Sequence, residues 1–309
     1  MIIRAGIDEA GYGPVFGPLT VTCTAVTLKS GMYDQNAFQN MFSSGGNTSA
    51  QITDSKKVFT SSKSLKRLEH LALSIVSLCA EKPIGSFSEL IHFATGEPAG
   101  TVFSNCPWYS GNDFSLPVEK TTAALDPAGL GNTGISDMNI FSSVISVSRF
   151  NSMLMQGLNK GGLLFCTVCS LLDRLIGAYP EGNFSIVVDR LGGRKFYAQC
   201  LLEQFPLWSI RKIRENSNSS AYALFKDGRT VEIEFRVKAD SSELLVSASS
   251  LVSKYIRELS MKLFNAFFSG MHPGIRPTQG YPGDADRFLR DISPFMERFD
   301  SPSSLVREC

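Results

Sequence analysis

The chain has 309 residues, 43% of them hydrophobic, which is enough to bury the core of one large domain or two ordinary ones. Its net charge of +1 gives no overall electrostatic case for a nucleic-acid partner, and its seven irregularly spaced cysteines exclude a secreted disulfide framework. No apolar run approaches the roughly 18 residues that span a bilayer, and the chain does not open on a signal peptide. These features predict a cytoplasmic monomer with buried free thiols.

The first stretch that carries chemistry is residues 6–18, an apolar run followed by two adjacent acids and a turn rich in glycine and proline. Residues 2–8 are predicted to form a buried strand, and residues 19–28 a second strand antiparallel to it. Asp8 and Glu9 fall where the first strand ends, and the glycines that follow permit unusual backbone dihedrals. Taken alone, such a segment is most simply an acidic strand end with a solvated loop.

The next part of the chain alternates between regular and irregular patterns. Residues 43–49 are predicted to be a loop, and residues 63–79 carry the apolar spacing of a helix. Residues 83–134 are rich in proline and glycine, and we expect an insertion with little regular structure that shapes or covers a cleft. Within it, Trp108 and Tyr109 are more simply a packing anchor than a platform for a base.

The second half of the chain contains two more strands that lead to an acid. Residues 184–189 are an apolar run that ends at Asp189, and the carboxyl ends of strands are where open α/β sheets build sites. Asp227-Gly228 is a hairpin signal, and the return strand, residues 231–237, runs on to Asp240. The other predicted elements are strands at 142–147, 208–214 and 220–225, and helices within 150–176, 247–268 and 284–299.

Three predicted strands therefore end in carboxylates, which are Asp8, Glu9, Asp189 and Asp240. Four carboxylates at one sheet edge repel one another unless cations lie among them. Oxygen ligands suit Mg²⁺ or Mn²⁺, and two such ions roughly 3.5–4 Å apart can activate water and stabilise the leaving oxygen in phosphodiester cleavage. Three unpaired histidines offer little for a zinc site, and the sequence has neither a Gly-x-Ser-x-Gly elbow nor a P-loop.

The order of these motifs resembles that of the type 2 ribonucleases H. Six segments carry the resemblance: residues 6–14 (GIDEAGYGP), 54–57 (DSKK), 187–189 (VVD), 238–240 (KAD), 247–254 (SASSLVSK) and 280–282 (GYP). Asp240 matches the ribonuclease HII pattern, because ribonuclease HIII is expected to carry glutamate there. Residues 16–18 (FGP) are similar to ribonuclease HIII.

The resemblance implies an α/β fold of the ribonuclease H type, with a central mixed sheet flanked by helices. It implies a single catalytic domain over residues 1–309 with a C-terminal helical extension at 247–309. It also implies Mg²⁺- or Mn²⁺-dependent endonucleolysis of the RNA strand in RNA–DNA hybrids, including ribonucleotides embedded in duplex DNA. The implied products carry 5′-phosphate and 3′-hydroxyl ends.

The resemblance assigns roles to individual residues. The implied metal ligands and catalytic residues are Asp8, Glu9, Asp189 and Asp240. The implied substrate contacts are Gly11, Tyr12, Gly13, Ser55, Lys56, Ser249, Lys254 and Tyr281. Backbone groups of the glycine loop would contact the 2′-hydroxyl, which distinguishes RNA from DNA. The tyrosine would pack on the sugar, and the serines and lysines would contact phosphates.

The chain departs from the family pattern in the substrate-binding motifs. Tyr12 stands where the family usually has arginine or lysine, and Gln279 where it has lysine. The insertion at 83–134 and the hairpin at 227–228 are also additions. Two alternatives therefore stay open: a protein of this fold that binds hybrids or branched nucleic acids without efficient cleavage, and a related nuclease that acts on DNA alone.

Overall fold

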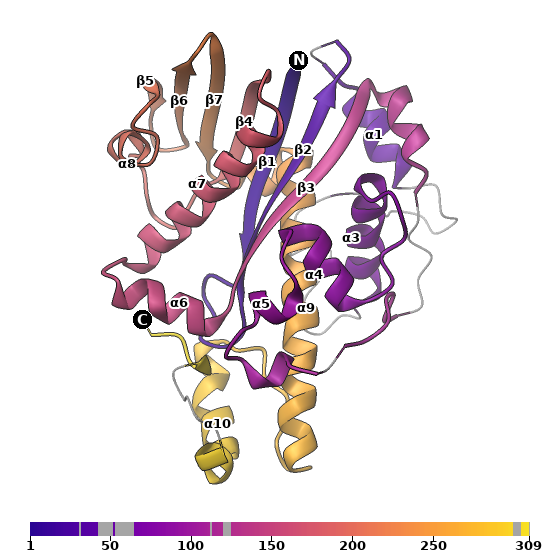
Figure 1. Ribbon diagram of the computed structural model, residues 1–309, viewed down its shortest axis with the longest axis vertical. Helices are drawn as coiled ribbons and strands as arrows, with labels where there is room; N and C mark the ends of the chain where they lie inside the picture. The colour runs from indigo at the N-terminus through magenta and orange to yellow at the C-terminus, as the bar shows by residue number, and fades with distance from the viewer. Residues whose placement is uncertain are drawn as a thin grey trace.

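The centre of the computed structural model is a seven-stranded mixed sheet in the order β3-β2-β1-β4-β7-β6-β5 (Figure 1). The model describes residues 1–30, 32–42, 52, 65–111, 113–119, 125–298 and 304–308. The strands are β1 (Ile2–Ala10), β2 (Leu19–Leu28), β3 (Ile135–Ile145), β4 (Asn183–Asp189), β5 (Ser209–Glu215), β6 (Ser219–Lys226) and β7 (Arg229–Arg236). The predicted α/β class and mixed sheet are therefore confirmed.

Strand direction decides where the acids meet. β1 is antiparallel to β2 and parallel to β4, and β4 is parallel to β7. The carboxyl ends of β1, β4 and β7 therefore lie at one edge of the sheet. The predicted pairing of the first two strands is confirmed, as is the hairpin between β6 and β7, where Asp227 and Gly228 both have positive φ.

Helices cover both faces of the sheet and create two apolar cores. α9 (Leu244–Met271) packs with α3 (Lys66–Cys79) and α4 (Phe87–Thr95) on one face. α7 (Lys160–Ala178) and α8 (Ala198–Gln204) cover the other, and α6 (Val147–Met155) precedes α7. Figure 1 shows α7 in front of the sheet and α9 behind it. Because both faces are covered, every residue of β2 is buried.

Within the described ranges, the remaining elements are short or lie at the C-terminal end. They are α1 (Gln35–Met41), α5 (Ala99–Val102), α10 (Pro282–Ile292) and four 3₁₀ helices, at Pro107–Tyr109, Pro127–Thr133, Ala239–Ser241 and Ser293–Arg298. The predicted C-terminal helical region is confirmed. α6 and α7 separate at residues 156–159, within the stretch 150–176 for which helices were predicted.

The expectation of little regular structure in residues 83–134 is wrong. α4 lies there, capped by the Ser86 hydroxyl, which accepts from the Glu89 N–H, and ended by Gly96 in the left-handed region. Trp108 is 2% exposed, with its ring 5.6 Å from that of Phe264 on α9, so it is the packing anchor that we expected. The segment is part of the α9 core.

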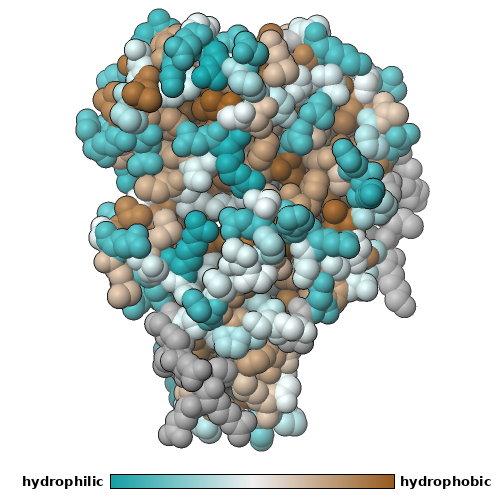
Figure 2. All heavy atoms as spheres, in the orientation of Figure 1, coloured by the Kyte–Doolittle hydropathy of each residue, from teal (hydrophilic) through white to brown (hydrophobic). Residues whose placement is uncertain are grey.

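Of the helices in the described ranges, α7 alone is long and apolar enough to cross a membrane by length and composition. No apolar run long enough to span a bilayer was expected from the sequence, and α7 is an exception to that expectation. Just over half of its most apolar window is buried in the protein, as is usual for a core helix. Figure 2 shows hydrophobic residues scattered among hydrophilic ones on this side of the molecule.

Candidate active site

Asp8 and Asp189 lie side by side on neighbouring strands. β1 continues to Ala10, so the prediction that this strand ends at Asp8 and Glu9 is wrong, and Glu9 points to the opposite side of the sheet from Asp8. Ile7 of β1 pairs with Val188 of β4, and side chains alternate along a strand, so the two aspartates that follow share one side of the sheet. Asp8 is buried, and its Oδ1 accepts from the Glu9 N–H at 2.7 Å. Burial, followed by the negative charges of Glu9 and Asp189, raises the pKa of Asp8 well above its usual range. The surroundings of Asp8 therefore disfavour further negative charge and favour a positive one.

Asp240 reaches the same edge from a turn and not from a strand, which corrects the sequence prediction. β7 ends at Arg236, and Lys238 has a φ of +54°, which turns the chain into the 3₁₀ helix Ala239–Ser241. The Ala239 N–H donates to Asp189 Oδ1 at 2.7 Å, and Asp240 beside it is buried. A hydrogen bond from the residue before Asp240 thus joins this turn to Asp189 at the end of β4.

The four acids carry the kind of ligand atom, carboxylate oxygen, that a hard divalent cation prefers. Within the described residues, no three His, Cys, Asp or Glu side chains form a ready-made metal cluster. The four acids offer only carboxylate oxygens, which Mg²⁺ and Mn²⁺ prefer. Burial first, and then the negative charges of Glu9 and Asp189, raise the pKa of Asp8, and a cation bound beside it would favour its ionised form.

Glycines allow close packing beside these acids. A Cβ at Gly6 would lie 2.2 Å from the Val246 N, because β1 runs directly against the start of α9. Gly11 has a φ of +86°, and a Cβ there would lie 2.6 Å from the Pro18 oxygen. Gly13 is exposed, and the nearest atom to its Cβ position is a Tyr281 ring carbon at 3.9 Å. The loop therefore has a tight inner end and an open outer end.

Tyr281 is brought to this loop by hydrogen bonds of the preceding segment. The Gly280 oxygen accepts from the Val15 N–H at 2.7 Å, and Tyr281 is 51% exposed. Arg257 of α9 lies beneath, its guanidinium 5.8 Å from the Tyr281 ring centroid. Its Nη2 donates to the Gln279 oxygen. The two motifs expected to contact a ribose are thus neighbours in space.

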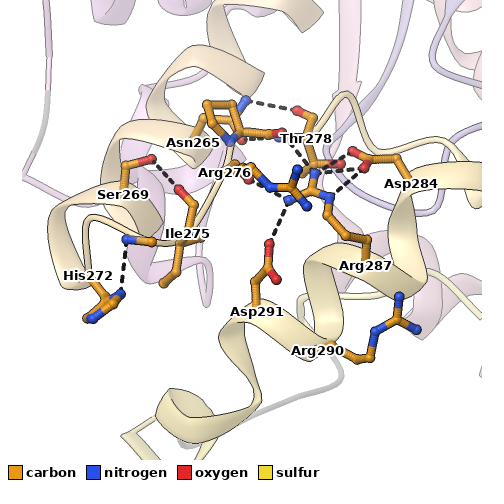
Figure 3. A network of polar contacts seen from close by, with 12 residues as sticks. Asn265, Ser269, His272, Ile275, Arg276, Thr278, Asp284, Arg287, Arg290 and Asp291 are labelled. Atoms are coloured by element: carbon orange, nitrogen blue, oxygen red, sulfur yellow. Dashed lines mark hydrogen bonds and ion pairs between the residues drawn. The ribbon is translucent and has the colours of Figure 1, made fainter.

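A polar network fixes that segment between α9 and α10 (Figure 3). The Asn265 side chain donates to the Thr278 oxygen and accepts from the Thr278 N–H. Arg287 donates to the Arg276 carbonyl oxygen and is ion-paired with Asp284 and Asp291. The loop that carries Tyr281 is therefore held from both helices.

Tyr12 lies between the start of α7 and the turn after β4. The Lys160 Nζ is 4.9 Å from the Tyr12 ring centroid, and a Cβ at Gly192 would lie 3.6 Å from the Tyr12 hydroxyl. Burial, followed by the negative charge of Glu9, raises the pKa of Tyr12. Lys160 of α7 thus places a positive charge beside Tyr12, the position at which the family motif usually has arginine or lysine.

The other sequence-predicted contacts differ in position. Ser249 is fully buried, accepts from the Thr24 N–H and lies 2.8 Å from the Gly6 oxygen, so it fixes α9 to the sheet and is not a surface group for a phosphate. Lys254 is half-buried on the same helix. Ser55 and Lys56 lie outside the described residues.

Sequence reasoning missed Arg257. It is 3% exposed on α9, next to Gly11 and Tyr281, and its partners lie in distant parts of the chain. The only signal was a charged residue within the apolar stripe of a predicted helix.

The chain was compared with known proteins. No family model and no curated protein matches it. Matched solved structures include the ribonuclease HII of Archaeoglobus fulgidus in its PCNA complex, with 16% identity, 99% of this chain and 93% of that chain covered, and a TM-score of 0.48. The ribonuclease H2 of Pyrococcus horikoshii OT3 matches at 16% identity, over 99% and 92% of the chains, with a TM-score of 0.47.

A third matched structure is the ribonuclease H3 of Aquifex aeolicus, at 13% identity over 98% and 71% of the chains, with a TM-score of 0.46. These structures are type 2 ribonucleases H. They belong to the family that the motif order resembles.

Proposed function

We propose that the protein is a divalent-metal-dependent endoribonuclease that cleaves the RNA strand of RNA–DNA hybrids, including ribonucleotides embedded in duplex DNA. The observation that supports this most directly is the position of the buried Asp8 beside Asp189, at the same edge of the sheet on the parallel strands β1 and β4. A glycine loop and an exposed tyrosine lie beside these acids, as recognition of a ribose requires.

In this proposal Asp8, Glu9, Asp189 and Asp240 hold Mg²⁺ or Mn²⁺. Bound metal would supply the charge that activates a water and stabilises the leaving 3′-oxygen. The carboxylates of the chain keep that charge at the edge of the sheet, where the buried Asp8 and its neighbours stabilise it. The products would carry 5′-phosphate and 3′-hydroxyl ends.

Substrate recognition in the proposal comes from the loop and its surroundings. Backbone groups of Gly11 and Gly13 would contact the 2′-hydroxyl, and the exposed ring of Tyr281 would pack on the sugar. Lys160 beside Tyr12, and Lys254 on α9, would contact phosphates. Ser55 and Lys56 remain proposed phosphate contacts from the sequence motif.

The test is incision of three duplexes in Mg²⁺ and in Mn²⁺: one with a single ribonucleotide, one long hybrid and one all-DNA duplex. We expect incision of the first two, and a loss of at least about 10²-fold in Asp8→Asn, since a ligand held in a preorganised site is removed. Asp286→Asn, an exposed acid on α10, is the matched control and should retain activity.

Each alternative has its own outcome in this test. Incision of the all-DNA duplex at the same rate would instead identify a DNA-directed nuclease. Folded protein that binds the hybrid without incision in either metal would contradict the proposal and favour a binding protein.

A further inference from the structure

The C-terminal segment, residues 304–308, lies across the inner side of the glycine loop. Its anchor is Arg307, which is 3% exposed. The Arg307 Nη1 donates to the carbonyl oxygens of Gly11 and Pro14, and its Nε and Nη2 donate to that of Gly17. One guanidinium, from a residue 290 positions away, thus binds three carbonyls of a single loop.

The segment is itself fixed to α6, beside which the C-terminus lies in Figure 1. The Asn151 side chain donates to the Val306 oxygen and accepts from the Glu308 N–H. The Arg307 guanidinium lies 4.9 Å from the Phe150 ring centroid, and the Arg307 N–H donates to the Val15 oxygen. The guanidinium is therefore held on a rigid element while it binds the loop.

This arrangement gives the loop two chemically different sides. The carbonyls of Gly11, Pro14 and Gly17 are occupied on the inner side. Over the described part of the chain, no group accepts a hydrogen bond from the N–H of Tyr12 or of Gly13. Gly13, exposed beside Tyr281, thus keeps a free donor while the acceptors of the loop are bound within the protein, and donors are what a ribose oxygen or a phosphate needs.

We propose that Arg307 is a positioning residue of the active site and that residues 304–308 are an integral part of ribose recognition. The inference rests on the proposed function for its substrate, and on the contacts above for the clamp. Arg307 acts through the loop: it fixes the backbone direction at residues 11–17, and the loop then selects duplexes that contain a ribonucleotide.

The experiment compares Arg307→Ala with the wild-type chain and with Arg290→Ala, an exposed arginine on α10 that points away from the network in Figure 3. Amide hydrogen exchange at Val15 and Phe16, whose N–H groups donate to the Gly280 oxygen, reports whether the clamp holds the loop. The ratio of affinities for a one-ribonucleotide duplex and the same all-DNA duplex, measured in EDTA, reports recognition without cleavage. Methylguanidinium is then added as a replacement for the missing guanidinium.

We expect Arg307→Ala to speed exchange at Val15 and Phe16 by at least about tenfold and to lower the affinity ratio by about tenfold, the effect of losing charged hydrogen bonds. Methylguanidinium should restore both, and Arg290→Ala should change neither. Unchanged exchange would overturn the clamp, and faster exchange with an unchanged ratio would overturn its part in recognition.

Two further outcomes are separated by design. If Arg307→Ala does not fold, Arg307→Lys, which keeps the charge but offers fewer donors, should show the same changes at smaller size, and the absence of both changes would overturn the inference. If the wild-type chain shows no preference for the ribonucleotide, the proposed function and the recognition role fail together. The exchange result then still decides whether Arg307 holds the loop.

Discussion

At the scale of single residues, Gly6 and Gly13 of the first motif differ in the space that a side chain would find. A Cβ at Gly6 would meet the α9 backbone at 2.2 Å, whereas one at Gly13 would meet only a ring carbon at 3.9 Å. We therefore expect Gly6→Ala to lower the free energy of unfolding by about 3 kcal/mol or more, because backbone atoms cannot move aside as side chains do. Gly13→Ala is the matched control.

Urea unfolding of both variants measures the difference. Gly13→Ala should stay within about 0.5 kcal/mol of the wild-type chain. A destabilised Gly13→Ala protein, or an unaffected Gly6→Ala protein, would contradict the contact between β1 and α9. The comparison also separates a glycine needed for packing from one needed at the open end of the loop.

Asp8 carries a second prediction at this scale. Burial and two neighbouring acids raise its pKa in the folded chain, so its ionised form costs folding free energy without metal. The wild-type chain in EDTA should therefore gain stability, relative to Asp8→Asn, as the pH falls through that raised pKa. At neutral pH Asp8→Asn should be at least as stable as wild type, and a clearly less stable variant in urea unfolding would contradict the crowding.

At the scale of elements, Glu69 ties α3 to distant segments. Its carboxylate is fully buried and accepts from the N–H groups of Val118 and Glu119 and from the Tyr255 hydroxyl on α9. Glu69→Ala would leave these donors without a partner, at a cost of about 3 kcal/mol or more. Thermal unfolding against Glu81→Gln, an exposed acid, measures it. If Glu69→Ala lost no more stability than Glu81→Gln, the hydrogen bonds of Glu69 would not stabilise the packing of α3.

The elements that sequence reasoning predicted best are those whose pattern is local. The apolar runs that lead to Asp8 and Asp189, and the turn at Asp227-Gly228, each predicted a strand from only a few neighbouring residues. α4 was missed because a nine-residue helix between prolines carries too few turns for a clear period. Its capping residues, Ser86 and Gly96, were the usable signal.

At the scale of the whole molecule, sequence predicted that Asp8 and Asp189 approach the same edge of the sheet, which the parallel pairing of β1 and β4 bears out, but it did not predict what surrounds them. Their common position follows from strand order, which a motif order can suggest. The contacts of Arg257 and Arg307 join segments more than 200 residues apart, and no periodicity encodes such pairs. Long-range hydrogen bonds of this kind become visible only once the chain has folded.

The same scale carries the prediction that tests the metal site without catalysis. A cation that binds only the folded chain raises its stability by RT ln(1 + [L]/Kd), about 2.7 kcal/mol at a concentration of 100 Kd. Mg²⁺ or Mn²⁺ should therefore raise the unfolding midpoint of the wild-type chain. Asp189→Asn removes one of the charges that crowd Asp8, so the rise should be smaller in that variant.

Asp286→Asn, exposed on α10, should keep the full rise, and NaCl at matched ionic strength should not produce it, because simple screening does not distinguish the two acids. An equal rise in the wild-type chain and in Asp189→Asn would mean that the ions bind elsewhere. The acids at the shared edge of β1 and β4 would then be a source of repulsion without a ligand, and the proposed chemistry would lose its support.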